Sequence, residues 1–156
     1  MVFPIQPAGS APASSAPTAP ALRVATAGEA LFDLIEEPDG RLKPCAGGAV
    51  YNLTRALGLQ GVGTQYLNPL SGDMLGRQLA RGLHEAGVAL AAPTPVRAPS
   101  ALALAALDAG GKASYSFYRD GVADRQVTAA ALNAACAALP DLQVVAECEH
   151  GPATLE

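Results

Sequence analysis

The sequence predicts an α/β protein in which a central sheet carries a small β flap. Two observations lead to this class. Short apolar runs typical of buried strands alternate with longer segments whose apolar residues recur at helical spacing. Two further strand-like segments flank the turn "LDAGGK" and indicate a β-hairpin. Because alternating strands and helices form layered α/β sheets, we interpret the hairpin as an insertion into such a sheet.

The first half of the chain supplies two strands, a helix and a third strand. The segment "LRVATAGEALFDLIEE" reads as a buried strand, a glycine break and a second apolar run, and "EEPDGRLKP" reads as a turn. After the double glycine of "CAGGAVYNLTRALG", apolar residues recur at helical spacing, and Gly58 is expected to end this helix. Residues 61–67, "GVGTQYL", predict a short strand.

The second half supplies two helices, the hairpin and a last strand. Asp73 is expected to cap a helix that runs through Glu85, with Gly87 as its end. In the hairpin, Tyr115 and Phe117 alternate with serines and share a face. Thr128 predicts the start of a third helix, expected to run to residue 139, and residues 142–145 predict one more buried strand.

Composition and charge limit the possible classes of function. The chain has 156 residues, enough for one domain, and half of them are hydrophobic. Its net charge of −4 argues against non-specific nucleic-acid binding, which needs a basic surface. No apolar run approaches the ~20 residues that span a bilayer, and no secretory signal is evident. The three cysteines lack CxxC spacing, so we interpret Cys45, Cys136 and Cys148 as free thiols of a cytoplasmic protein.

The two ends of the chain differ from its middle. Residues 1–21 are rich in Pro, Ala and Ser and carry no charged side chain, which predicts a disordered leader. Residues 146–156, "AECEHGPATLE", are charged and turn-prone where a strand-to-helix transition would be expected. An α/β sheet that stops after so few strands would expose an edge, so the sequence reads like half of a larger fold.

Gly47 and Gly48 precede the first helix and raise the question of what needs bare backbone there. Such a pair lets a ligand approach the main chain and presents amide groups at the positive end of a helix, which suits an anion or a polyhydroxyl compound. A tight strand-to-helix turn is the alternative. The segment is neither a Walker A loop nor a dinucleotide fingerprint, because neither glycine pattern occurs in the chain.

Three further features could bind a polyol. Asp33 interrupts the apolar run "ALFDLIEE" and could accept from two vicinal hydroxyls, although it could also be the exposed alternate position of a strand, and Glu29 has a weaker case. Asn52 could both donate to and accept from a hydroxyl, or simply face solvent. The segment "SYSFYRDGVADR" holds three of the seven aromatic residues; its aromatics could cover a sugar ring or seal the flap against the core, and Arg119 could reach sugar oxygens.

Taken together, four segments are similar in order and spacing to the N-terminal half of the ribokinase/fructokinase (PfkB-type) carbohydrate kinases. They are "GEALFDLIEE", "AGGAVYNLTRALGLQG", "YLNPLSGDMLGRQLARGLHEAGV" and "SALALAALDAGGKASYSFYRDGVADR". The resemblance covers residues 22–145 and is greatest to the bacterial fructokinase-like branch. It implies a ribokinase-like (Rossmann-like) central sheet with a small β lid, whose hairpin spans about residues 98–120.

The resemblance assigns a sugar site. The residues implied to bind the sugar are Asp33, Gly47, Gly48, Asn52, Phe117, Tyr118 and Arg119. Asp33 would bind hydroxyls, the two glycines would line the pocket with backbone, and the two aromatic residues would come from the lid. A ketohexose such as fructose is the expected substrate. One departure is that Asn68 and Ser71 stand where the family usually has glycines.

A larger departure concerns catalysis. The catalytic base, the anion hole and the ATP pocket of such kinases lie in a C-terminal half with a GAGD-type motif, which this chain lacks. The resemblance therefore implies ATP and Mg²⁺ for an intact enzyme, but we expect neither to bind this chain well, and we expect the chain alone to be an inactive, truncated or frameshifted kinase. The alternatives are a non-catalytic sugar-binding module or a module that forms a homodimer through its lid. A dinucleotide-binding oxidoreductase half is disfavoured by the missing fingerprint.

Overall fold

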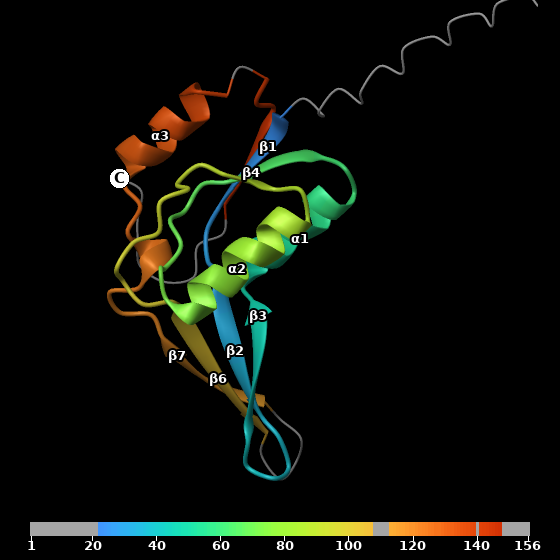
Figure 1. The fold of residues 1–156 in the computed structure, drawn as a ribbon, viewed down its shortest axis with the longest axis vertical. Helices are drawn as coiled ribbons and strands as arrows, with labels where there is room; N and C mark the ends of the chain where they lie inside the picture. The colour runs from blue at the N-terminus through green and yellow to red at the C-terminus, as the bar shows by residue number, and fades with distance from the viewer. Residues whose placement is uncertain (1–21, 108–112, 140, 148–156) are drawn as a thin grey trace, which may run out of the picture.

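A computed structural model describes residues 22–107, 113–139 and 141–147 of the chain and shows two four-stranded sheets (Figure 1). The first, called the core sheet, is parallel throughout and has the order β5 (Ala89–Leu90), β4 (Gly63–Tyr66), β1 (Leu22–Ala27), β8 (Val144–Glu147). The second, called the lid sheet, has the order β3 (Leu42–Gly47), β2 (Leu31–Glu36), β6 (Ala101–Leu107), β7 (Ala113–Tyr118).

Helices cover both faces of the core sheet. They are α1 (Ala49–Leu59), α2 (Met74–Glu85) and α3 (Ala129–Ala137), and a short 3₁₀ turn, η1 (Ala123–Arg125), precedes α3. The helices α1 and α2 pack together on one face, while Leu132 of α3 packs against Ala25, Ala27 and Leu67 at the other. The lid sheet projects away from this layered body (Figure 1). The predicted α/β class with a small β lid is therefore confirmed.

The main hydrophobic core lies between the α1–α2 pair and the two sheets. Its largest fully buried members are Tyr51, Tyr66, Leu79 and Leu83. Phe32 of the lid strand β2 belongs to the same cluster, so the base of the lid sheet is anchored in the core. Burying such a side chain contributes about 1.5–3 kcal/mol, which makes this anchor a substantial constraint on where the lid begins.

The ends of α1 and α2 test the predicted helix boundaries. Asp73 caps α2 by accepting from the Gly76 N–H at 2.7 Å, as predicted, and Gly87 ends that helix with a φ of 76°. The predicted end of α1 at Gly58 is wrong. The helix continues to Leu59, and Gly61, whose φ is 77°, is the left-handed residue that stops it.

The turn predicted over "EEPDGRLKP" is shorter than expected. The chain reverses between Glu37 and Arg41, which share a backbone hydrogen bond of 2.8 Å, and then forms β3 antiparallel to β2. The strand was missed because its sequence, "LKPCAG", contains Pro and Gly. Proline is tolerated at an edge strand, and β3 is an edge of the lid sheet.

The predicted hairpin of β6 and β7 is present, although its connecting residues lie outside the described ranges. The last predicted strand is displaced to Val144–Glu147, and it is not buried: Val144 and Val145 are 52% and 51% exposed. In the described part of the chain, β8 pairs only with β1, so its outer edge stays uncovered. The predicted leader 1–21 and most of the predicted tail 146–156 lie outside the described residues, and this division of the chain stays a prediction.

The remaining predictions concern the cysteines, the third helix and membrane-spanning segments. Cys45 and Cys136 are free thiols, while Cys148 lies outside the described residues. Oγ1 of Thr128 caps α3 by accepting from the Ala131 N–H at 3.1 Å, and α3 ends at Ala137, before the expected residue 139. No helix within the described ranges is long and apolar enough to cross a bilayer.

Candidate sugar-binding site

The register of the lid sheet places Asp33 and Phe117 on one face. Asp33 of β2 pairs with Cys45 of β3 and Ala103 of β6, and Ala103 pairs with Phe117 of β7. Directly paired residues point to the same side of a sheet, so these four form one row, called the Asp33 row. With strands about 4.8 Å apart, the Asp33 and Phe117 backbones lie roughly 10 Å from each other. A half-buried carboxylate and an exposed aromatic ring thus share a surface.

The glycine corner adjoins the same carboxylate. Gly47 pairs with Leu31, two residues before Asp33, and a Cβ at Gly47 would overlap Oδ2 of Asp33. Gly48 has a φ of 104°, and a Cβ there would lie 2.7 Å from the carbonyl oxygen of Glu29. Gly48 is thus restricted to glycine by its backbone conformation and by the Glu29 carbonyl, whereas a side chain at Gly47 would displace the Asp33 carboxylate. The bare backbone noted in the sequence therefore leaves room for protein atoms, and it also brings the start of α1 beside Asp33.

The Asp33 carboxylate accepts no hydrogen bond from the described residues. Burial raises the pKa of its carboxyl above the usual value, and the negative charge of Glu29 raises it further. A carboxylate in this situation is destabilised by lack of solvation and gains from any hydroxyl that donates to it. The arrangement suits a polyol better than an anion, because an anion would add repulsion.

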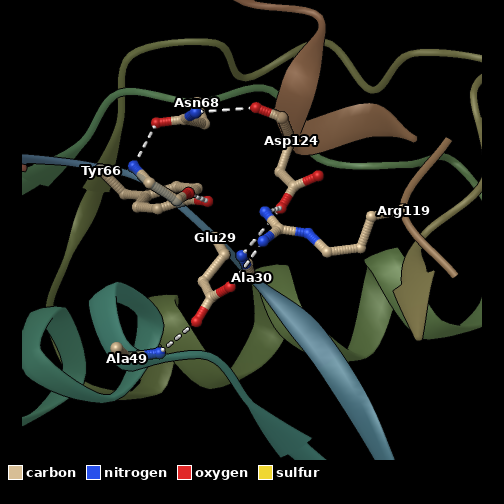
Figure 2. Close-up of polar contacts among 8 residues, drawn as sticks. Glu29, Ala30, Ala49, Tyr66, Asn68, Arg119 and Asp124 are labelled. Atoms are coloured by element: carbon tan, nitrogen blue, oxygen red, sulfur yellow. Dashed lines mark hydrogen bonds and ion pairs between the residues drawn. The ribbon is translucent and has the colours of Figure 1, made fainter. Parts of the chain in front are cut away.

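Arg119 follows β7 directly and is held by two carboxylates (Figure 2). Its Nη1 atom donates to Oε2 of Glu29 at 2.9 Å, and its Nη2 atom lies 3.5 Å from Oδ2 of Asp124. The Arg119 side chain is only 14% exposed. The guanidinium thus joins protein segments, and its predicted position at the polar edge of a ligand stays a prediction.

Glu29 and Asp124 extend the contacts of Arg119 into the backbone. Oε1 of Glu29 accepts from the Ala49 N–H at 3.0 Å and so caps the start of α1, where Gly48 supplies no side chain. Oδ2 of Asp124 accepts from the Ala30 N–H at 3.3 Å. Burial raises the pKa of the Asp124 carboxyl, although Arg119 opposes the shift. The sequence drew attention to Glu29 only weakly and not at all to Asp124.

Asn68 and Tyr66 complete this polar region on the core-sheet side (Figure 2). Asn68 accepts from the Gly28 N–H at 2.8 Å and donates to the Asp124 carbonyl at 2.7 Å, while the Tyr66 hydroxyl donates to the Gly28 carbonyl at 2.6 Å. The backbone N–H and carbonyl of Gly28, which lies between β1 and β2, therefore both have hydrogen-bond partners. Asn68 is one of the departures from the family pattern, and here it has a definite structural task.

Two of the predicted sugar-binding residues, Tyr118 and Asn52, do not lie in the Asp33 row. Tyr118 pairs with Leu102, in the row of Phe32, so its side chain emerges on the face opposite to Phe117. Asn52 is exposed one turn into α1; its backbone N–H donates to the Gly48 carbonyl at 3.0 Å, and its side chain has no hydrogen-bond partner among the described residues. Its side chain is thus available to a ligand. The structure brings Asp33, Gly47 and Gly48 together and sets Phe117 in the same row.

A separate hollow lies on another face of the lid sheet. An open groove of about 690 Å³ lies between β3 and the helices α1 and α2. It is lined on the lid side by Phe32, Pro44 and Ala46, which belong to the face opposite to Asp33. The groove is therefore not the candidate sugar site, which is defined by the Asp33 row and the glycine corner.

The described residues offer little to hold a nucleotide or its metal. They contain no group of three or more His, Cys, Asp or Glu residues that could bind a metal ion. No glycine-rich GAGD-type segment occurs in the sequence. Among the described residues, no position is therefore assigned to ATP or Mg²⁺.

Comparison with known proteins places the fold in one class. No protein-family model matches the chain. A PfkB protein from Polaromonas sp. JS666 has a structure that matches with a TM-score of 0.62 at 20% identity, over 71% of this chain and 40% of its own, and this likeness concerns the fold. The two sheets and three helices thus form part of a ribokinase-like fold.

The relationship extends to sequence for one group of enzymes. The chain is 34% identical over 109 residues to a fructokinase from Rhizobium leguminosarum bv. trifolii, a match that covers 67% of this chain and 33% of the relative. A fructokinase from Xylella fastidiosa is 34% identical with a TM-score of 0.64, covering 71% of this chain and 37% of its own, and its structure has also been determined with bound ATP. The chain is therefore a partial homologue of the sugar kinases of the ribokinase/fructokinase (PfkB-type) family, as the four segments predicted. It spans about a third of the length of the curated relative that it matches.

Proposed function

We propose that this chain is the sugar-binding and lid portion of an ATP-dependent sugar kinase, with a ketohexose such as fructose as the ligand. The observation that carries the proposal is the Asp33 row: a carboxylate that lacks a donor among the described residues, beside the start of α1, on the same sheet face as Phe117. A carboxylate binds hydroxyls strongly, and an aromatic ring covers the apolar face of a sugar. The fructokinase relatives support the choice of sugar.

The other residues of the proposed site have different roles. Gly47 and Gly48 bring the amide end of α1 beside the ligand, and Asn52 supplies a further hydrogen bond from the first turn of that helix. Tyr118 and Arg119 contribute to the lid, where Arg119 acts through its two carboxylate partners.

Binding can be tested by calorimetric titration of the chain with fructose. We expect weak binding that is specific to hydroxyl arrangement and is lost in Asp33→Ala. Charged hydrogen bonds contribute about 1.5–3 kcal/mol each, so the loss should be on the order of tenfold or more. The matched control is Asp39→Ala, which removes an exposed carboxylate at the tip of the β2–β3 hairpin and should bind like the parent. Equal affinities of Asp33→Ala and parent would remove the basis of the assignment.

Turnover is a separate question. Because the sequence has no GAGD-type motif and the described residues offer no assigned nucleotide site, we propose that the chain forms no phosphorylated sugar from ATP by itself. A coupled assay for ADP release with a pure preparation would test this, and any turnover that depends on Asp33 would overturn it.

A second candidate function is self-association through the lid sheet. Five of the large exposed apolar side chains belong to that sheet: Ile35, Leu42, Tyr115, Phe117 and Tyr118. The Tyr115 and Phe117 rings stack with centroids 6.1 Å apart, giving a rigid apolar surface. Sedimentation of the parent against Tyr115→Ser should show a dimer that the substitution weakens, and a monomeric parent would exclude this candidate.

A further inference from the structure

Two buried carboxylates and a mostly buried guanidinium lie where the chain passes between the core sheet and the lid sheet. Glu29 stands between β1 and β2, Arg119 follows β7, and Asp124 lies in η1, through which the chain returns toward α3. We call these residues the hinge triad. Their side chains are 10%, 14% and 2% exposed, respectively.

The members of the hinge triad contact different segments of the chain. Glu29 accepts from the start of α1 through Ala49, at 3.0 Å, and from Arg119, at 2.9 Å. Asp124 accepts from Ala30 at the start of β2, at 3.3 Å, and lies 3.5 Å from Arg119. One guanidinium therefore ties the end of the last lid strand to the first lid strand and to the helix beside the glycine corner (Figure 2).

A rotation of the lid sheet about its base would separate these groups. Exposed ion pairs contribute little and re-form easily, whereas breaking a buried pair leaves charge without compensation in a poorly solvated place. The planar guanidinium also fixes direction, because its donors have a rigid fork geometry. A contact of this kind favours one lid orientation over the alternatives.

We infer that the hinge triad is a positioning device that holds the lid sheet at one angle to the core sheet, so that the Asp33 row, with Phe117 in it, already has its binding position relative to the core sheet before a sugar arrives. The inference rests on the proposed function only for the identity of the ligand. Its residues do not bind the sugar themselves. They act on affinity through the fraction of molecules whose lid is already placed for binding.

The chain offers native reporters of lid angle. Cys45 lies on β3 of the lid sheet and Cys136 lies on α3, against the core sheet, and both thiols are free. With Cys148→Ser as background, spin labels on these two thiols report the distance between lid and core by pulsed electron resonance. The parent should give one narrow distance distribution.

Removing the triad should disturb that distribution. We expect Arg119→Met and Glu29→Gln to broaden or displace it by several ångströms, with circular dichroism unchanged. Arg119→Lys, which keeps the charge but loses the fork, should fall between them and the parent. The matched control is Arg41→Met, which breaks the exposed Asp39–Arg41 pair and should leave the distribution as in the parent.

Sugar titration of the unlabelled variants completes the test. Arg119→Met should lower the affinity about tenfold, in step with the loss of the narrow distance population, and Arg41→Met should leave it unchanged. Folded Glu29→Gln and Arg119→Lys variants with the parent's distance distribution would overturn the inference, even if Arg119→Met itself did not fold. If the parent binds no sugar, the proposed function fails while the distance measurement still decides on the hinge triad.

Discussion

The glycine corner gives a prediction in which two neighbouring positions should fail in different ways. At Gly48 the backbone has a φ of 104°, which side chains of L-residues rarely adopt, and a Cβ would lie 2.7 Å from the carbonyl oxygen of Glu29. Backbone atoms cannot move aside cheaply. Gly48→Ala should therefore destabilise the fold by about 1–3 kcal/mol from strain alone, with the overlap adding to it.

At Gly47 the obstacle is of another kind. A Cβ there would overlap Oδ2 of Asp33, which is the end of a rotatable side chain. Moving the carboxylate aside costs little stability, and alanine in a strand regains roughly 0.5–1 kcal/mol relative to glycine. Gly47→Ala should thus stay within about 1 kcal/mol of the parent in unfolding free energy. It should nevertheless lose sugar affinity by tenfold or more, on the order of one charged hydrogen bond, because Asp33 has been displaced.

Both variants can be compared by urea unfolding, thermal melting and calorimetry with fructose. Gly48→Ala should lower the melting temperature by about 4 °C for each kcal/mol lost, whereas Gly47→Ala should melt near the parent. The reasoning is refuted if Gly48→Ala melts like the parent, or if a folded Gly47→Ala binds fructose with unchanged affinity while Asp33→Ala does not.

Two further predictions concern hydrogen-bonded side chains, those of Asp73 and Tyr66. Asp73 accepts from Gly76 at 2.7 Å and from both donors of Ser100 at 2.8 Å; although burial alone would raise its pKa, these hydrogen bonds lower it below 3.8. Its contribution to stability is hence complete above about pH 4 and is lost as the pH falls through the lowered pKa, so Asp73→Ala should cost about 1–2 kcal/mol near neutrality and progressively less in acid, measured by urea unfolding at several pH values. A loss that is constant with pH would count against this. Burial raises the pKa of Tyr66 well above 10, so Tyr66→Phe should show the same phenolate absorbance as the parent until alkaline unfolding begins, and should cost roughly 1 kcal/mol for the lost bond to Gly28. A phenolate signal that disappears with Tyr66 while the protein is still folded would contradict the burial.

Local signals in the sequence were enough for elements whose ends are defined by side chains. Asp73 predicted the start of α2, and Gly87 predicted its end, because a capping carboxylate and a left-handed glycine act within a few residues. The end of α1 was placed at Gly58 because two glycines compete for it. Gly58 is helical, since its missing Cβ lets the Ala86 carbonyl pack against it, and Gly61 makes the turn.

Features set by distant partners were harder to predict. Strand β3 exists because β2 offers it an antiparallel edge, which overrides the low strand propensity of "LKPCAG". The alternation around Phe117 indicated its face correctly, but only the register with β6 and β2 shows that it shares that face with Asp33. Likewise, the ion pair between Glu29 and Arg119 could not be predicted, because its two residues are far apart in the sequence and a buried ion pair leaves no short-range pattern.

The position of β1 in the core sheet has a consequence for synthesis on the ribosome. This strand is made before the others, yet it lies between β4 and β8, so one of its edges can pair early while the other waits for residues 144–147. A nascent chain in that interval presents an open parallel edge, which is a template for association with other chains. We therefore expect its yield of native protein to depend on chaperones that shield β1 during translation.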